Sequence, residues 1–236
     1  MMKLPWTVFC GWLLLVLAGC NTNDSSTTTA TPPAASKSAA PATAAKPTVL
    51  FFGNSLTAGL GVEPDEAFPA LIGQKIDSAG LNYTVVNAGL SGETTAGGRS
   101  RVGWVLRKPV AMFVLELGGN DGLRGIPLTD TRRNLQAIID TVRQLSPQAQ
   151  IVLAGMQIPP NLGADYAAEF KQLYGELARK NDLVLIPFLL EGVGGVAKFN
   201  QRDGIHPTPA GHRLVARTVW DILRPVLQQP QPAAGS

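Results

Sequence analysis

The sequence predicts an α/β domain in which helices cover both faces of a five-stranded parallel sheet. Five short apolar runs are nearly continuous, as strands are when both faces of a parallel sheet are covered. The stretches between these runs are longer and amphipathic, which is typical of surface helices. This repeated alternation favours a parallel sheet joined by right-handed crossovers. In chain order, the runs are residues 49–52, 85–87, 110–117, 151–154 and 183–186.

Two of the predicted helices have clear patterns. The last one begins with Thr208 as its cap and Pro209 in its first turn, a common start for a helix. The helix after the third strand places apolar side chains at helical spacing, with charged residues on its other face. Its apolar positions are Leu128, Leu135, Ile138, Ile139, Val142 and Leu145.

Residues 1–19 are predicted to be a signal peptide that directs export. Lys3 precedes an apolar run at 6–18 that is too short for a permanent membrane helix. The sequence Leu17-Ala18-Gly19-Cys20 resembles the lipobox of bacterial lipoproteins. That resemblance implies cleavage before Cys20, lipidation of Cys20, and a periplasmic protein anchored to a membrane. The alternative is an ordinary secretory signal with a coincidental cysteine.

Residues 20–46 are predicted to be the lipidated cysteine and a disordered tether, followed by a folded domain at 47–228 and a flexible tail at 229–236. Within 21–46, 21 residues are Ala, Thr, Ser or Pro. Such a segment cannot bury enough apolar surface to offset the entropy lost on ordering.

Charge and cysteine content exclude several kinds of function. The net charge is +3, but without the three lysines and one aspartate of 1–46 the chain holds 17 basic and 16 acidic residues. Nucleic-acid binding needs a clustered basic surface, so no such partner is expected. The two cysteines, Cys10 and Cys20, both precede the domain. The domain therefore has no disulfide, no cysteine nucleophile and no zinc–thiolate site.

Polar, glycine-rich segments follow the predicted strands, at the sheet edge where α/β proteins bind ligands. Asp203 precedes His206 by three residues, so its carboxylate can orient one ring nitrogen while the other points into a cleft. Ser55 follows the first strand and is the candidate nucleophile, with His206 as its base. The other histidine, His212, falls within the last helix and is interpreted as structural.

Acyl transfer also needs donors aimed at the developing oxyanion. The backbone N–H groups of Ser55 and Gly89 and the side-chain amide of Asn120 are the candidates. Taken singly, Ser55 could instead cap a helix and Gly89 could be an ordinary turn glycine.

Four blocks together resemble the SGNH (GDSL-type) hydrolases in order and spacing, over residues 48–227. They are Gly53-Asn54-Ser55-Leu56, Gly89, Gly118-Gly119-Asn120-Asp121 and Asp203-Gly204-Ile205-His206. Two longer strings, at 115–125 and 156–161, are similar to the thioesterase I and arylesterase branch of that family.

The resemblance implies a three-layer flavodoxin-like fold with strand order 2-1-3-4-5 and no metal or cofactor. It implies that Ser55, His206 and Asp203 form a catalytic triad, and that Ser55, Gly89 and Asn120 form the oxyanion hole. One departure is Asn54, which stands where the family usually has aspartate, so an amide replaces a charge beside Ser55.

The expected function is hydrolysis of acyl esters and thioesters, including aryl esters and lysophospholipids, through an acyl-enzyme. The alternatives are an O-deacetylase acting on cell-wall or other polysaccharides, a non-catalytic lipoprotein that binds lipid or glycan, and a flavin-binding module. Arg99 and Arg101 are interpreted as a solvated helix face rather than a contact for an anionic head group. Four apolar residues are candidates for an acyl site or for the core: Ile158, Leu162, Phe188 and Leu189.

Overall fold

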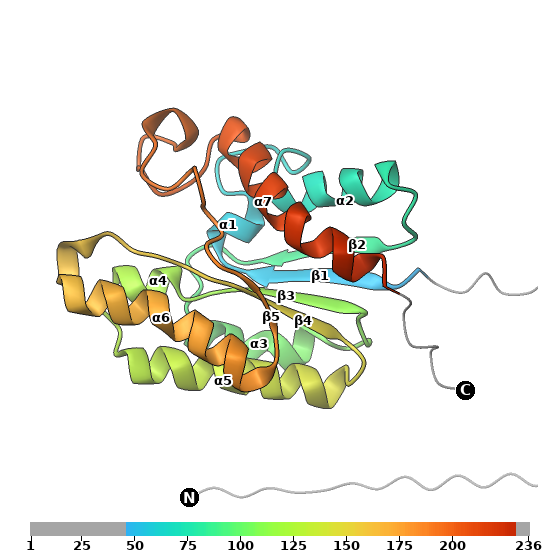
Figure 1. Ribbon diagram of the computed structural model, residues 1–236, viewed down its shortest axis with the longest axis horizontal. Helices are drawn as coiled ribbons and strands as arrows, with labels where there is room; N and C mark the ends of the chain where they lie inside the picture. Colours follow the sequence, from blue (N-terminus) through green and yellow to red (C-terminus); the bar gives the residue numbers. More distant parts are fainter. Residues whose placement is uncertain (1–45, 230–236) are drawn as a thin grey trace, which may run out of the picture. The chain divides into compact units, whose positions relative to one another are not determined.

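The computed structural model describes residues 46–229, which form an α/β/α sandwich around one parallel sheet (Figure 1). The strand order is β2-β1-β3-β4-β5, with every neighbouring pair parallel. The fold class and the strand order expected from the sequence are therefore confirmed. The strands are β1 (Thr48–Gly53), β2 (Thr84–Gly89), β3 (Met112–Glu116), β4 (Gln150–Ala154) and β5 (Val184–Ile186).

Helices α2 and α7 cover one face of the sheet, and α3, α5 and α6 cover the other (Figure 1). Thr208 caps α7 as predicted, since its Oγ1 accepts a hydrogen bond from the Gly211 N–H at 3.3 Å. The long helices are α2 (Phe68–Ser78), α3 (Thr95–Val105), α5 (Leu128–Leu145), α6 (Ala164–Asn181) and α7 (Pro209–Leu227).

Strand β2 differs from the prediction that all five strands are covered on both faces. It lies at the edge of the sheet, and most of its residues are partly or fully exposed. Val86, in its middle, is 38 % exposed. A short apolar run does not distinguish a central strand from an edge strand, because coverage depends on the neighbouring elements.

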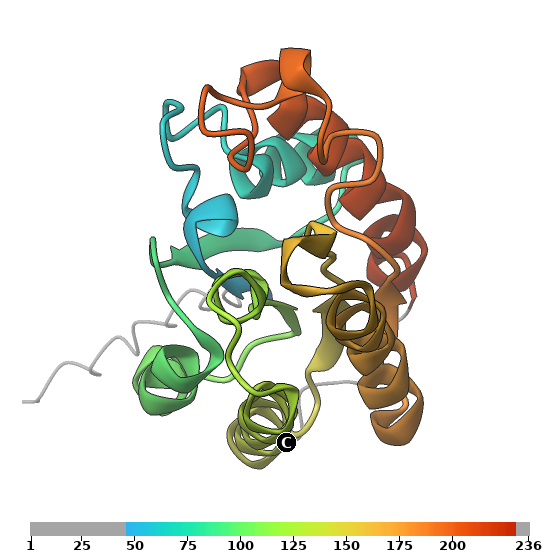
Figure 2. The same ribbon diagram turned by 90° about the vertical axis from the view of Figure 1, so that its left-hand side faces the viewer.

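The carboxyl ends of the strands meet at one edge, which faces the viewer in Figure 2. Four short elements lie in the loops there: α1 (Ser55–Ala58), α4 (Gly119–Leu123), η1 (Pro160–Leu162) and η2 (Ala197–Phe199). No helix within residues 46–229 is long and apolar enough to cross a membrane. The predicted signal peptide, Cys20, residues 21–45 of the tether and residues 230–236 of the tail lie outside the described residues.

Candidate active site

Ser55 follows the end of the interior strand β1, on the first turn of α1. Asn54 caps this helix, because its Oδ1 accepts a hydrogen bond from the Leu56 N–H at 2.9 Å. Gly53 makes the tight turn possible, since a Cβ there would lie 2.1 Å from Thr57 Oγ1. The strand thus delivers the Ser55 hydroxyl to the sheet edge while most of the residue is covered, as its exposure is only 7 %.

His206 and Asp203 complete a hydrogen-bonded chain with Ser55. Ser55 Oγ lies 2.8 Å from His206 Nε2, and His206 Nδ1 lies 2.6 Å from Asp203 Oδ2. The other carboxylate oxygen of Asp203 accepts the backbone N–H groups of Ile205 and His206, both at 3.0 Å. These bonds, above all the one to the His206 ring, lower the pKa of Asp203 to about 2.

This chain of contacts determines which protons can move. An ionised Asp203 only accepts hydrogen bonds, so it holds the proton of His206 on Nδ1. Nε2 is then free to accept the proton of Ser55. The structure therefore brings together the three residues predicted for the triad, in the order in which a proton would pass.

Gln201, which no sequence pattern indicates as a site residue, holds the His206 loop in place. Its backbone N–H donates to the His206 carbonyl at 2.7 Å. Its side-chain amide donates to the carbonyls of Leu60, at 2.7 Å, and Pro207, at 3.0 Å. The bond to Leu60 joins this loop to the segment after α1, so Gln201 ties the loop of His206 to the one that follows Ser55.

The two other predicted oxyanion donors also reach this edge, and both are engaged. The Gly89 N–H donates to Asn87 Oδ1 at 2.9 Å. A Cβ at Gly89 would lie 2.2 Å from the Ala58 nitrogen, so only glycine allows this approach to α1. Asn120 Nδ2 donates to the Glu93 carbonyl at 2.9 Å, which uses one of its two hydrogens.

The prediction that Arg101 belongs to a solvated helix face is wrong. Its guanidinium donates to the Glu93 carboxylate at 2.5 Å and to the Ala88 carbonyl at 2.8 Å. It also lies over the Phe52 ring, 4.1 Å from the centroid. Arg99 donates more weakly, to Asn134 Oδ1 at 3.4 Å. Arg101 is thus part of the framework of the site.

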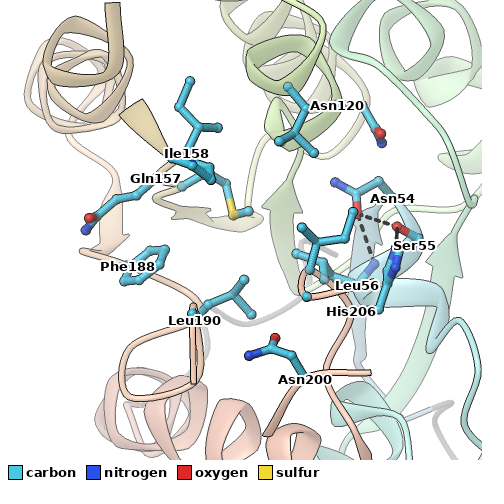
Figure 3. A pocket seen from close by; sticks show the side chains of 18 residues that line it. Asn54, Ser55, Leu56, Asn120, Gln157, Ile158, Phe188, Leu190, Asn200 and His206 are labelled. Atoms are coloured by element: carbon cyan, nitrogen blue, oxygen red, sulfur yellow. Dashed lines mark hydrogen bonds between the residues drawn. The ribbon is translucent and has the colours of Figure 1, made fainter. Parts of the chain in front are cut away.

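An apolar cavity of about 410 Å³ opens beside Ser55. In Figure 3, Ser55 and His206 stand on one side of it, across from Ile158 and Phe188. Of the four predicted acyl-site residues, these last two line the cavity. Leu189 is fully buried in the core, and Leu162 is 43 % exposed outside the lining. The lining also includes apolar residues that were not predicted: Leu56, Leu123, Met156, Pro159, Leu190 and Ile205.

His212 is structural, as its position in the last helix suggested. It is 1 % exposed, and its Nδ1 accepts the Phe68 N–H at 3.3 Å. Phe68 begins α2, and the preceding Ala67 has no side chain that could cap this helix. Burial lowers the pKa of His212 to about 4 and keeps the ring neutral.

Residues 51–214 match the GDSL-like Lipase/Acylhydrolase family. The chain belongs to this family. Esterase TesA of Pseudomonas aeruginosa is 41% identical over 186 residues, which are 78% of this chain and 91% of that protein. Thioesterase 1/protease 1/lysophospholipase L1 of Escherichia coli K12 is 36% identical over 185 residues, 78% of this chain and 86% of its own. A crystal structure of TesA matches with a TM-score of 0.73 at 40% identity, covering 76% of this chain and 99% of that one.

Membership of this family confirms the resemblance that the four sequence blocks indicated. It also confirms the predicted enzyme class, an SGNH-type hydrolase of acyl esters. Within residues 46–229, no cluster of three or more His, Cys, Asp or Glu side chains could hold a metal ion.

Proposed function

We propose that this chain is a serine esterase and thioesterase that hydrolyses acyl esters through an acyl-enzyme formed on Ser55. The observation that supports this best is the chain of hydrogen bonds from Ser55 through His206 to Asp203 beside an apolar cavity. In this proposal Ser55 is the nucleophile, His206 the general base and acid, and Asp203 the residue that orients His206.

The reaction follows from these positions in two halves. Ser55 Oγ attacks the acyl carbonyl while its proton moves to His206 Nε2, and the tetrahedral adduct holds the negative charge on the former carbonyl oxygen. The adduct then collapses, and His206 returns the proton to the departing alcohol or thiol. Water, deprotonated by His206, attacks the acyl-enzyme in the second half and releases the acid and free Ser55.

The Ser55 N–H and the second hydrogen of the Asn120 amide are proposed to stabilise the oxyanion. The Gly89 N–H is proposed to join them, which requires it to exchange the Asn87 side chain for the oxyanion. That exchange replaces a neutral acceptor with a charged one, and hydrogen bonds to charged acceptors are the stronger.

The proposed substrates have a flexible acyl chain and a variable leaving group. The cavity beside Ser55 has a mainly apolar lining that suits an acyl chain, since burial contributes about 0.8 kcal/mol for each methylene. The names of the two relatives, an esterase and a thioesterase/lysophospholipase, support esters, lysophospholipids and acyl thioesters as the classes to test, with aryl esters among the esters.

The Ser55→Ala variant tests the mechanism. We expect kcat for p-nitrophenyl butyrate to fall by about 10³-fold or more, since removing a nucleophile of this kind costs at least that much. The parent should react with a fluorophosphonate probe and the variant should not. Ser78→Ala, at an exposed site on α2, is the matched control and should behave like the parent.

Parental activity in Ser55→Ala would refute the mechanism. An unreactive parent would favour the non-catalytic lipid- or glycan-binding lipoprotein. A series of p-nitrophenyl esters and thioesters from acetyl to dodecanoyl then separates the remaining alternative. A steep loss beyond acetyl would point to a polysaccharide or cell-wall O-deacetylase, whereas the apolar cavity predicts that longer chains are accepted.

We also propose that the chain is exported and anchored to a membrane through lipid on Cys20, the last residue of Leu17-Ala18-Gly19-Cys20. Labelled palmitate should be incorporated by the parent in a bacterial host, and the label should disappear in Cys20→Ser. Cys10→Ser is the control and should retain it. Label that persists in Cys20→Ser would show that the cysteine is not the acceptor.

A further inference from the structure

Glu116 is a buried carboxylate directly beneath the turn that holds Ser55. It ends β3 and is 1 % exposed. Its Oε1 accepts the Asn54 side-chain amide at 2.7 Å. Its Oε2 accepts the Asn54 backbone N–H at 3.1 Å and the Thr57 hydroxyl at 2.8 Å. All three contacts connect the carboxylate to the turn between β1 and α1.

Asn54 in turn connects Glu116 to Ser55. Its Nδ2 donates to Glu116, while its Oδ1 accepts the Leu56 N–H at 2.9 Å and lies 3.5 Å from Ser55 Oγ. These partners define the orientation of the amide, because a flipped amide would face the carboxylate with oxygen and the N–H with a donor. The NH2 group of the amide therefore has an acceptor, and its oxygen has a donor.

We propose that Glu116 is a positioning residue for the Ser55 nucleophile, and that Asn54 is the partner that allows this buried carboxylate to remain ionised beneath it. The inference rests on the proposed function, since positioning matters only if Ser55 reacts. It also assigns a role to Asn54, which stands where the family usually has aspartate.

The chemistry of the contacts favours the ionised form of Glu116. Two of its partners, the N–H and the amide of Asn54, can only donate, and a carboxylate accepts both without competition. Burial acts in the other direction and raises the pKa of Glu116 to about 7, although the hydrogen bonds to Thr57 and Asn54 lower it. Protonation would bring an O–H among donors and loosen the turn.

Aspartate at position 54 would change this balance. The carboxylate of the introduced aspartate would face Glu116 Oε1 at the place of the present 2.7 Å hydrogen bond. Two carboxyl groups at such a short distance must share a proton. The surrounding titratable and charged groups are Tyr174 on α6, Asp121 on α4, Arg101 on α3 and His206. Within residues 46–229, none of these four groups forms a hydrogen bond with the Glu116 carboxylate.

A double-mutant cycle tests the pairing by exchanging the two groups. Asn54→Asp places a carboxyl group against a carboxyl group. Glu116→Gln replaces one acceptor oxygen by an NH2 group, which then faces either the Asn54 side-chain NH2 or the Asn54 backbone N–H, and both of these donate. The combined variant Asn54→Asp/Glu116→Gln restores complementarity. The Nε2 of the introduced glutamine donates to the introduced aspartate, and its Oε1 accepts the backbone N–H of residue 54 and the Thr57 hydroxyl. The exchange changes neither the size of the side chains nor their total charge.

We expect kcat/KM for p-nitrophenyl butyrate to fall at least tenfold in Glu116→Gln at pH 8 to 9, where Glu116 is ionised, which corresponds to about 1.4 kcal/mol. The loss should be smaller at pH 6, where most of the parent's Glu116 is protonated. Asn54→Asp should be close to the parent at pH 6, where the carboxyls share a proton. It should lose activity relative to the parent as pH rises and that proton leaves. The combined variant should recover to within about threefold of the parent, with no such dependence on pH.

Two further variants serve as controls. Thr57→Val removes a single hydrogen bond to Glu116, so it should give a smaller loss of kcat/KM than Glu116→Gln. It tests the same contact if Glu116→Gln does not fold. Glu176→Gln, on the surface of α6, makes the same chemical change and should match the parent. The midpoint of thermal unfolding should show the same rescue, and it can be measured even if the parent has no esterase activity.

Three results would overturn the proposal. They are parental activity in Glu116→Gln, a combined variant no better than the worse single variant, or a ratio of Asn54→Asp to parent that does not change with pH. A parent without activity would instead refute the proposed function. Rescue of the unfolding midpoint alone would show that the pair is structural and does not position Ser55.

Discussion

Arg101 joins two strand ends to the loop between β2 and α3, whose Glu93 carbonyl binds the Asn120 amide. Its Nη2 donates to the carbonyls of Gly53, at 3.3 Å, and Ala88, at 2.8 Å, near the ends of β1 and β2. Its ion pair with Glu93 is largely covered, with 2 % of the Glu93 side chain exposed. The Glu93 carbonyl accepts the Asn120 amide. One side chain therefore influences where Ser55 and Asn120 stand relative to each other.

Replacing Arg101 by methionine keeps an unbranched side chain but leaves the Glu93 carboxylate buried without a cation. We expect the free energy of unfolding to fall by about 3 kcal/mol, the lower end for a broken buried pair. Esterase kcat should fall as well, because the carbonyl that holds Asn120 shifts with Glu93. Denaturant titration and initial rates measure the two effects.

The control for this change is Arg107→Met, on the exposed end of the same segment, where the guanidinium lies over Trp104. It should alter the free energy of unfolding by no more than about 0.5 kcal/mol. If Arg101→Met were equally mild, Glu93 would be solvated well enough without its partner, and the framework role of Arg101 would be wrong.

At the scale of elements, the sequence predicts best what repeats along the chain. The apolar runs of β1, β3 and β4, the helical spacing of α5 and the capped start of α7 are local patterns that follow burial or chain geometry, so the existence and type of these elements were predicted. Coverage of β2 was not, because an edge position depends on which strands pair. The four-residue helix α1 was also missed, since its cap and its turn depend on Glu116, 62 residues from Asn54.

The same contrast holds for the candidate site. Asp203 and His206 are three residues apart, so their contact is local and could be read from spacing. Gln201 reaches Leu60, 141 residues away, and no local pattern signals that bond. Neighbouring side chains in a loop also point in different directions. Leu190 lines the cavity while Leu189 enters the core, a difference that two adjacent leucines do not reveal.

At the scale of the whole molecule, two buried titratable groups oppose each other in how stability depends on pH. The pKa of Glu116 rises from 4.5 to about 7 on folding, so the folded chain holds its proton more firmly. Its contribution is present below pH 4.5 and is lost as pH rises to 7. The pKa of His212 falls from 6.5 to about 4, so its contribution is present above pH 6.5 and is lost as pH falls to 4.

The two pH ranges overlap between pH 4.5 and 6.5. In this range, unfolding adds a proton to His212 and releases one from Glu116. Each shift corresponds to about 3 kcal/mol, so the two slopes nearly cancel in the parent. We expect its free energy of unfolding to change little across this range.

Substituting one of the two groups should reveal how the other makes the free energy of unfolding depend on pH. In His212→Asn, whose Oδ1 can still accept the Phe68 N–H, stability should increase as pH falls from 7 to 4.5. In Glu116→Gln it should decrease as pH falls from 6.5 to 4. Urea titrations at half-unit steps of pH measure the slopes, and only the slopes matter, because each substitution also changes stability by an amount independent of pH. Parallel curves for the parent and both variants would mean that neither group changes its pKa on folding.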